Sequence, residues 1–399
     1  WQGGFFNARL EGRTGRSVLQ RAGSVSAVNN DALFPNVVDR FDEEALAAAS
    51  LAQVHRATLP DGREVVVKIQ RPDVQTMVAA DLGVMQDLAD VMEDRFELAR
   101  RLDAKGILEE FASGVLIELD YRNEAYHMRR LDENMAQIPG VRVPYVDGAR
   151  SARRVLTMEF IRGVKINDVA AMEAAGVDRD DVARRLLRAV IKQILVDGFF
   201  HGDPHPGNLF VIPETGRIVF IDCGLVGELD SPQRTALLDL IYSLKTNAFD
   251  SIATAVIRLS EKAPGFDEAA FRSRLDRQLR QFMVYGDDPD LATALGSILA
   301  TVYSSGLRLD SNLTMAIKAI IQATETAAIL APDIDLGDAA IQEARDSIVA
   351  QLAPEKVKEF AQAKAIEVGK ELLARVPTLE AAAWSWLDQF GRGKLVVQL

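Results

Sequence analysis

The sequence has little of several features that commonly direct a fold or a partner. Its 399 residues include one cysteine, Cys223, so no disulfide can form within the chain, and a cytoplasmic setting is expected. Lys and Arg number 46 against 58 Asp and Glu, and this acidic balance argues against nucleic-acid binding, which needs a basic surface. No uninterrupted apolar stretch approaches the roughly 20 residues of a membrane-spanning helix, so none is predicted.

Hydrophobic residues, at 48%, are nevertheless ample for a buried core, and the length allows two or three domains at roughly 150 residues each. The chain begins Trp1-Gln2-Gly3-Gly4, without an initiator Met or a signal-peptide pattern. We therefore expect a fragment of a longer protein, in which any membrane association is carried by segments missing from this chain.

Hydrophobic periodicity predicts an α+β fold in which a small sheet precedes a helical half. The turn Pro60-Asp61-Gly62-Arg63 indicates a hairpin, and the other strands are expected over 50–59, 64–69, 141–143 and 154–158. Helices are expected over 74–102, 105–131 and 178–198, the last capped by Asp178. Ser231 is the predicted cap of the next helix, after which the chain is expected to be helical to about residue 376, with breaks near 265, 286–289 and 331–332.

The segment 201–224, HGDPHPGNLFVIPETGRIVFIDCG, is the most informative part of the sequence. Asp203 is followed five residues later by Asn208, and a short apolar strand then ends at Asp222. This is the kinase layout HxDxxxxN followed by DxG, in which the first Asp orients the attacking hydroxyl and the Asn and second Asp hold Mg²⁺ on the phosphates. A polar turn capping a buried strand would not need two Asp and one Asn in this order.

A phosphoryl-transfer site also needs positive charge on the nucleotide phosphates. Lys68 ends the run VVVK, the position of a kinase third-strand lysine, and such a lysine usually has a carboxylate partner on the next long helix. Glu118, Asp120 and Glu124 are the candidates, and we choose Glu124 for the ion pair. The alternative for this acidic segment is an ordinary solvated helix face.

The nucleotide-binding residues depart from the usual kinase pattern. Where a Gly-rich loop would cover the phosphates, the chain has Ala47, Ala48, Ala49 and Ser50, and the alanine methyl groups keep the backbone from approaching as closely. Glu159 and Phe160 stand where a kinase hinge binds adenine through its backbone. No APE motif follows the DCG sequence, so a small molecule or a lipid is a more natural acceptor than a protein.

Taken together, five segments of the chain resemble the UbiB (AarF/ADCK, ABC1-like) family of atypical kinases. They are AAASLAQVHRATLPDGREVVVKIQRP, ELDYRNEA, MEFIRGV, GFFHGDPHPGNLFV and IDCGLVG. The resemblance implies a two-lobed kinase-like fold with an Ala-rich loop, Mg²⁺-dependent binding of ATP or ADP, and a link to ubiquinone or other isoprenoid lipids. It implies that Lys68, Glu124 and Asp203 are catalytic, that Asn208 and Asp222 are metal ligands, and that Glu118 and Asp120 are the ExD acids of the family.

On this resemblance we expect four segments, which are a lead-in (1–40), an N-lobe-like part (41–160), a C-lobe-like part with the catalytic loop (161–250), and a helical C-terminal region (251–399). Two departures bear on regulation. The family's KxGQ motif is absent from residues 1–40, and Cys223 replaces the Phe of DFG, which weakens the switch made by that side chain.

Two other functions stay open. One is a small-molecule phosphotransferase of the aminoglycoside or choline kinase type. The segment HGDPHPGN resembles the catalytic loop of that group equally well. The other is a nucleotide-binding scaffold that does no chemistry. Nucleotide is the expected partner in each case, with an isoprenoid lipid or a membrane surface as a further partner in the UbiB case, and the sequence names no protein partner.

Overall fold

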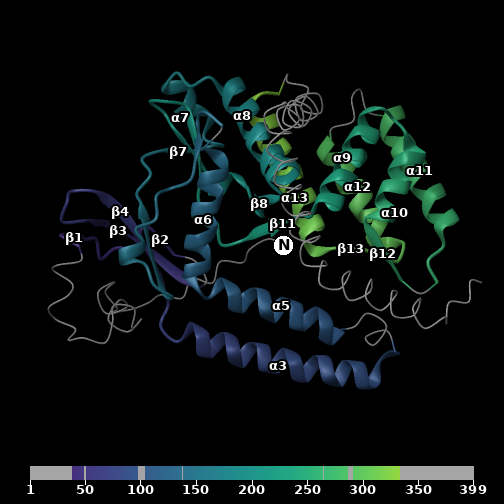
Figure 1. Ribbon diagram of the computed structural model, residues 1–399, viewed down its shortest axis with the longest axis horizontal. Coiled ribbons are helices and arrows are strands. Elements are labelled where there is room, and N and C mark those ends of the chain that lie inside the picture. Colours follow the sequence, from purple (N-terminus) through teal and green to yellow (C-terminus); the bar gives the residue numbers. More distant parts are fainter. Residues whose placement is uncertain are drawn as a thin grey trace, which may run out of the picture. The chain divides into compact units, whose positions relative to one another are not determined.

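A five-stranded antiparallel sheet organises the first part of the chain in the computed structural model, which describes residues 38–48, 51–97, 104–136, 138–263, 265–285 and 291–332 (Figure 1). Its strands are β1 (Arg40–Phe41), β2 (Ala47–Ala48), β3 (Ala52–Thr58), β4 (Glu64–Gln70) and β6 (Val155–Glu159). β4 lies between β3 and β6, which suits its β-branched run. Alternation sends Val65, Val67 and Ile69 into a buried apolar cluster and so places Lys68 and Gln70 on the opposite face.

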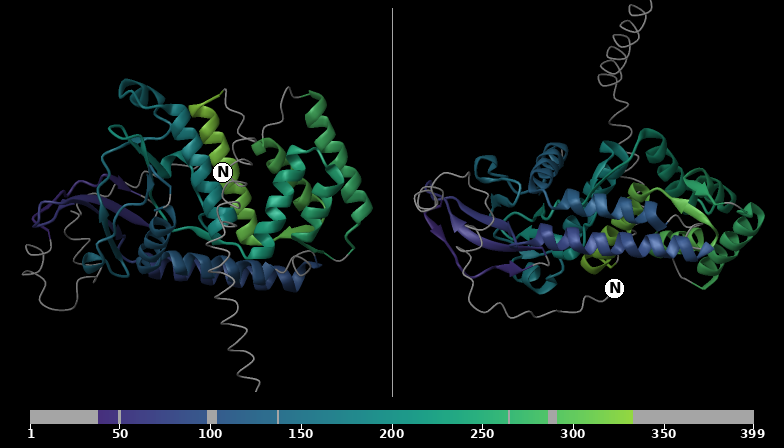
Figure 2. Two further views of the ribbon diagram at one scale, coloured as in Figure 1. Left: turned by 45° about the horizontal axis from the view of Figure 1, so that its top comes forward. Right: turned by 90° about the horizontal axis from the view of Figure 1, so that it is seen from below.

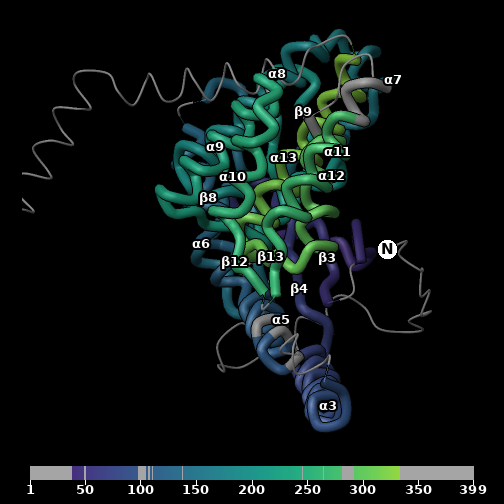
Figure 3. The backbone as a smooth tube through the Cα atoms, turned by 90° about the vertical axis from the view of Figure 1, so that its right-hand side faces the viewer, coloured from purple at the N-terminus to yellow at the C-terminus, as the bar shows by residue number. Residues whose placement is uncertain are grey.

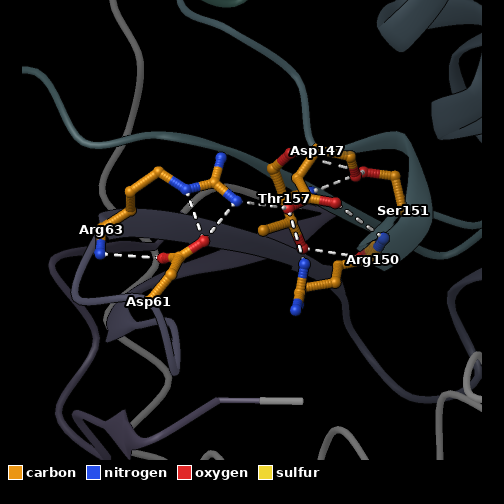
Figure 4. A network of polar contacts seen from close by, with 6 residues as sticks. All are labelled: Asp61, Arg63, Asp147, Arg150, Ser151 and Thr157. Carbon is orange, nitrogen blue, oxygen red and sulfur yellow. Dashed lines mark hydrogen bonds and ion pairs between the residues drawn. The ribbon is translucent and has the colours of Figure 1, made fainter.

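Polar contacts tie the turn of the β3–β4 hairpin to the segment before β6 (Figure 4). Gly62 has a φ of +84°, a conformation that favours glycine, and the predicted turn is confirmed. Arg63 donates from Nε to Oδ2 of Asp61 at 2.8 Å and lies 3.7 Å from Oδ2 of Asp147. Arg150 donates to that same oxygen of Asp147 at 2.9 Å. These contacts hold one end of the sheet.

Three helices follow the hairpin, namely α3 (Val74–Arg95), α5 (Ala104–Glu118) and α6 (Tyr121–Met135). α3 and α5 lie side by side (Figures 1 and 2). We expected one helix over 105–131, but the chain breaks between α5 and α6. Asp120 caps α6 by accepting from the backbone N–H of Arg122 at 3.1 Å, so the expected single helix was wrong.

The segment that carries the DCG sequence is built on two small sheets. The first pairs β5 (Val141–Arg142), β10 (Arg217–Phe220), β9 (Leu209–Ile212) and β7 (Val164–Lys165) in that order, and the second pairs β8 (Phe199–His201) with β11 (Val226–Glu228). Short helical segments lie between them, at Gly148–Arg150, Val169–Ala174 (α7) and Pro206–Asn208. Because β9 and β10 are antiparallel neighbours, the segments after β8 and after β10 come together.

Helix α8 (Arg179–Ile191) begins at the predicted cap, Asp178, and continues as a π-helical segment, Lys192–Asp197. It ends at Gly198, whose φ of +66° closes the helix as predicted. α8 is strongly amphipathic, and its buried face packs against α13 (Ser311–Leu330) (Figure 2). Since α13 crosses from the C-terminal region onto α8, the predicted boundaries at residues 160 and 250 stay predictions.

The C-terminal region is largely helical, as predicted, with α9 (Ser231–Lys245), α10 (Phe249–Arg258), α11 (Glu268–Tyr285), α12 (Leu291–Ser304) and α13. It also contains β12 (Ser260–Lys262) and β13 (Leu307–Leu309), which pair in antiparallel and were not expected (Figure 3). The cap of α9 is Asp230, not Ser231, because Asp230 and Gln233 form a reciprocal capping box. The predicted helix beyond Pro332 lies outside the described residues.

Among the described residues, α13 is the one helix that is long and apolar enough to cross a membrane by length and composition. More than half of that apolar window is buried inside the protein, against α8 and α12. Burial of this kind is the property of a core helix, so its hydropathy is explained by packing.

Candidate functional site

A cavity of about 290 Å³ brings together six of the residues singled out from the sequence. They come from β4, from the α5–α6 junction, and from the segments that follow β8 and β10. Its wall includes Lys68, Glu118, Glu124, Asp203, Asn208 and Asp222. These residues span 155 positions of the sequence, so the fold gathers them.

Lys68 is the centre of the charge arrangement. Its Nζ lies 3.0 Å from both carboxylate oxygens of Glu124 and 2.9 Å from Oδ1 of Asp222. The Lys68 and Glu124 side chains are 15% and 5% exposed, whereas Asp222 is 52% exposed and open to the cavity. The ring of Tyr121 lies 5.4 Å from the ammonium group and adds a cation–π contact. The contact between Lys68 and Glu124 that the sequence predicted is therefore present.

Burial and charge act in opposite directions on this group. Burial disfavours the Lys68 ammonium, but the carboxylates of Glu124 and Asp222 outweigh it, so the pKa of Lys68 lies above its ordinary value. Burial likewise opposes ionisation of Asp222, but the Lys68 charge outweighs it and lowers the pKa of that carboxyl. Lys68 and Asp222 are thus both charged at neutral pH.

The backbone at Asp222 is strained in a way that aims its side chain. Asp222 has a φ of +54°, in the left-handed region that non-glycine residues seldom adopt. The next residue, Cys223, is fully buried, and its carbonyl accepts a hydrogen bond from Nδ1 of His127 at 3.1 Å. Burial raises the pKa of the Cys223 thiol well above its usual value. Cys223 thus packs inside the protein while Asp222 turns toward Lys68.

His201 supports the loop that carries Asp203. It is buried, and burial lowers its pKa, so the ring is neutral. Its Nε2–H donates to the carbonyl of Ile221 at 3.0 Å, and its Nδ1 accepts from the backbone N–H of Asp203 at 3.2 Å. Asn208 donates from Nδ2 to the carbonyl of Asp203 at 3.1 Å. The side chains of His201 and Asn208 therefore fix the backbone on which Asp203 stands.

The two acids that the resemblance names as ExD separate in the structure. Glu118 lines the cavity, and burial together with the charge of Asp222 raises its pKa. Asp120 does not line the cavity, because its carboxylate caps α6 and binds the guanidinium of Arg122, with Nε to Oδ1 at 2.9 Å. The assignment of Glu118 and Asp120 as the ExD acids stays a prediction.

Four of the residues predicted to hold the nucleotide base and cover its phosphates, Ala47, Ala48, Glu159 and Phe160, do not line this cavity. Ala47 and Ala48 form β2 and pair with β3, while the predicted Ala49 and Ser50 lie outside the described residues. The Glu159 carboxylate binds the guanidinium of Arg142 and accepts from the backbone of Tyr145 at 3.3 Å. The ring of Phe160 packs under Arg56 at 4.5 Å. The roles given to these residues remain predictions.

Three polar residues in or beside the site were missed from the sequence. Gln70 lines the cavity, is buried, and donates from Nε2 to the carbonyl of Leu119 at 2.6 Å, which holds the α5–α6 junction against β4. Strand alternation from Lys68 was a signal that could have found it. Tyr121 follows the ExD acids directly. Gln322, on α13, donates to Oδ1 of Asp203 at 2.8 Å from 119 residues away, and no local signal announces it.

Comparison with known proteins identifies the family. The ABC1 atypical kinase-like domain matches residues 20–256, more than half of the chain. The chain belongs to the ABC1 atypical kinase-like family. The family predicted from the motifs is confirmed, and with it the kinase-like fold.

Curated relatives agree with this assignment. An uncharacterised protein of Mycobacterium tuberculosis (strain H37Rv) is 42% identical over 222 residues, which is 55% of this chain and 45% of that protein. Protein ACTIVITY OF BC1 COMPLEX KINASE 7, chloroplastic, of Arabidopsis thaliana is 36% identical over 295 residues, 73% of this chain and 42% of that protein. The chain therefore spans about half the length of these curated relatives.

A solved structure from Mycobacterium tuberculosis, described as a complex of the protein Rv3197 with erythromycin, is also similar. It is 25% identical, with a TM-score of 0.54, and the match covers 74% of this chain and 75% of that one. This structural likeness supports the kinase-like fold of the ABC1 chain.

Proposed function

We propose that this ABC1 chain binds Mg²⁺ and ATP in the cavity around Lys68 and transfers or hydrolyses the terminal phosphoryl group. The observation that carries the proposal is that Lys68 lies between Glu124 and Asp222 while Asp203 and Asn208 line the same cavity. Kinases of known mechanism need these groups in these positions. The family match supports the proposal, since its profile describes an atypical kinase-like domain.

The donor set suits a hard divalent cation. Asn208 uses its amide nitrogen on the Asp203 carbonyl, which leaves its side-chain oxygen available, and the Asp222 carboxylate is half exposed to the cavity. Carboxylate and amide oxygens are the ligands that Mg²⁺ prefers. When bound, Mg²⁺ would neutralise charge on the phosphates.

The protein's own groups divide the remaining work. Lys68, held by Glu124, would bind phosphate oxygens through its ammonium hydrogens. Asp203 would accept the proton of the attacking hydroxyl or water, and the His201 and Asn208 contacts would keep it in position. The cavity of about 290 Å³ is at the small end for ligand pockets, so it suits the phosphate end of a nucleotide, with the base lying elsewhere.

A link to ubiquinone or another isoprenoid lipid rests on the resemblance to the UbiB family. An exposed apolar surface on α3 and α5 supports contact with a membrane. The large exposed side chains on α3 are Met77, Val84, Met85, Leu88, Val91 and Met92, and those on α5 are Phe111, Leu116 and Ile117. Apolar patches of this kind mark interaction sites. The polar residues of α3 are mostly acidic, so we expect binding to neutral vesicles that does not depend on salt.

The test measures binding of a fluorescent ATP analogue with and without Mg²⁺, and ATP hydrolysis with and without phosphatidylcholine vesicles that contain a polyprenyl phenol. Asp222→Asn should abolish the Mg²⁺-dependent part of binding, and Asp203→Asn should leave binding intact while lowering turnover by orders of magnitude. Asp61→Asn, at the hairpin turn outside the cavity, is the matched control and should behave as wild type.

The outcomes separate the candidate functions. Turnover that rises with the lipid and disappears in Asp203→Asn supports the UbiB-type ATPase or kinase. Turnover that rises only with soluble aminoglycosides or choline supports the small-molecule phosphotransferase. Tight binding with no turnover in any condition supports the scaffold, and unchanged Mg²⁺-dependent binding in Asp222→Asn contradicts the metal assignment.

A further inference from the structure

A second cavity, of about 1300 Å³, lies on the other side of Asp203. Asp203 and Leu225 line both cavities, so these two residues form the boundary between them. The rest of the second wall comes mainly from the start of α9, from β12 and β13, and from one face of α13, with Arg258 of α10 and Tyr303 of α12. In phosphoryl transfer the catalytic carboxylate stands between the phosphate donor and the acceptor hydroxyl. The second cavity therefore occupies the acceptor side.

Gln322 gives this cavity a polar group directed at the reacting carboxylate. It lines the cavity, and its Nε2 donates to Oδ1 of Asp203 at 2.8 Å. Its other polar atom, Oε1, is buried and has no hydrogen-bond partner in the described part of the chain. An unpaired buried carbonyl is costly, and a hydroxyl of a bound molecule would satisfy it.

The wall carries charged residues of both signs, and one of them, Lys318, favours an anion near that hydroxyl. Two of its acids, Asp230 and Asp310, are committed to capping α9 and α13 through backbone N–H groups. Lys318 lies four residues before Gln322 on the same face of α13, about 6 Å along the axis, and forms no ion pair with any described residue. Apolar side chains, among them Leu225 and Met315, complete the wall.

We propose that this cavity binds the phosphoryl acceptor, and that the acceptor is an amphiphile carrying a hydroxyl group and an anionic group. The inference rests on the proposed function. The hydroxyl oxygen would lie at Asp203 and Gln322 and the anion at Lys318. In the bound state the hydroxyl donates to Oε1 of Gln322, and in the reaction it turns its proton to Asp203, which accepts it. The hydroxyl oxygen forms a bond to the γ-phosphorus of ATP, the bond from phosphorus to the bridging oxygen breaks, and ADP leaves with the electron pair.

The test uses three matched probes, which are 8-hydroxyoctanoate, its uncharged methyl ester, and octanoate, which lacks the hydroxyl. Affinities are measured by titration calorimetry without nucleotide. Wild type should bind 8-hydroxyoctanoate about tenfold more tightly than the ester, since a charge-assisted contact is lost. Lys318→Ala should remove that difference and Lys318→Arg should keep it. Lys165→Ala, on β7 and outside the cavity, is the control and should bind as wild type.

The role of Gln322 is tested by comparing the probes with and without the hydroxyl group. Wild type should prefer 8-hydroxyoctanoate to octanoate several-fold, and Gln322→Leu should remove that preference while leaving the preference for the acid over the ester. Equal binding of acid and ester by wild type, or a difference that persists in Lys318→Ala, overturns the proposal. The binding of Mg²⁺ and ATP is measured separately. If wild type did not bind them, that result would count against the proposed function and not against binding of the amphiphile.

Discussion

The contact between Lys68 and Glu124 allows a sharp test of how the site is built. In Lys68→Met the cation is removed, and Glu124, which is 5% exposed, remains without it. A buried carboxylate that loses its partner takes up a proton, because burial raises the pKa of Glu124 and only the Lys68 charge opposes that shift. The cost of the substitution is therefore set by the free energy of protonating that carboxyl.

This cost can be worked out at each pH. With an ordinary Glu pKa of about 4.3 in the unfolded chain, protonation costs about 3.7 kcal/mol at pH 7 and about 1 kcal/mol at pH 5. Lys68→Met should thus lower the free energy of unfolding by 3–4 kcal/mol at pH 7. The loss should shrink by about 2.7 kcal/mol at pH 5, because the unfolded chain then also binds the proton readily.

The reciprocal change should behave differently. In Glu124→Leu, Lys68 stays charged beside Asp222, whose Oδ1 lies 2.9 Å away. We therefore expect the free energy of unfolding to fall by about 3 kcal/mol, and this loss should not shrink between pH 7 and pH 5. The double substitution leaves neither charge buried. At pH 7 it should be more stable than Lys68→Met alone, because an ion pair replaced by apolar groups often costs little.

Urea unfolding followed by far-ultraviolet circular dichroism measures these differences at the two pH values. The matched control is Lys262→Met, which breaks a pair with Glu268 in which the two side chains are 50% and 44% exposed. It should cost less than about 1 kcal/mol at either pH. The reasoning is refuted if Lys68→Met costs the same at pH 5 as at pH 7, or if the two single losses simply add in the double variant.

Three further outcomes follow from the structure. Glu118→Gln should tighten binding of Mg²⁺ and ATP about threefold or more, measured by calorimetry, because it removes negative charge beside Asp222. Asp120→Ala should leave this affinity unchanged and should lower the free energy of unfolding in urea by about 1 kcal/mol, because the cap of α6 is lost. Burial lowers the pKa of His201, so below about pH 6.5 the unfolded chain binds a proton at this residue and the folded chain does not. The free energy of unfolding should therefore fall on acidification by up to about 1.4 kcal/mol per pH unit. The same pH series on His201→Gln should show a flatter profile. The Cys223 thiol, buried and with a raised pKa, should react with a disulfide reagent only as fast as the protein unfolds; a rate that rises in proportion to reagent concentration in the folded state would contradict its burial.

Local sequence predicted those parts of the site that depend on short spacing. Asp203, Asn208 and Asp222 lie on segments joined by the β9–β10 hairpin, so a motif of about twenty residues contains most of their geometry. Lys68 follows from strand alternation, since its neighbours Val67 and Ile69 must face the apolar cluster. In each case a period or a turn acts over few residues, and sequence can express it.

The prediction failed where two local signals competed. Helical spacing continues from residue 105 to 131, and it outweighed the capping signal of Asp120. The break at Asp120 decides the orientation of both acids, because it leaves Glu118 on the cavity wall and holds Asp120 against Arg122. The contact from Gln70 to the Leu119 carbonyl, which holds this break against β4, joins residues 49 apart in sequence and has no local signal.

The contact from Gln322 to Asp203 extends the site beyond the segment by which the family is recognised. The ABC1 match ends at residue 256, yet α13 supplies the one side-chain hydrogen bond that the described residues make to a carboxylate oxygen of Asp203. α13 can do this because its apolar face packs along α8, the helix that leads into β8 and the Asp203 loop. In the proposed function, the kinase motifs would place Asp203 against the phosphates, and the helical region would supply the groups on its other side. Two chains with the same motifs and different residues on this face of α13 would share phosphate chemistry and differ in acceptor, so acceptor choice is to be sought in α13.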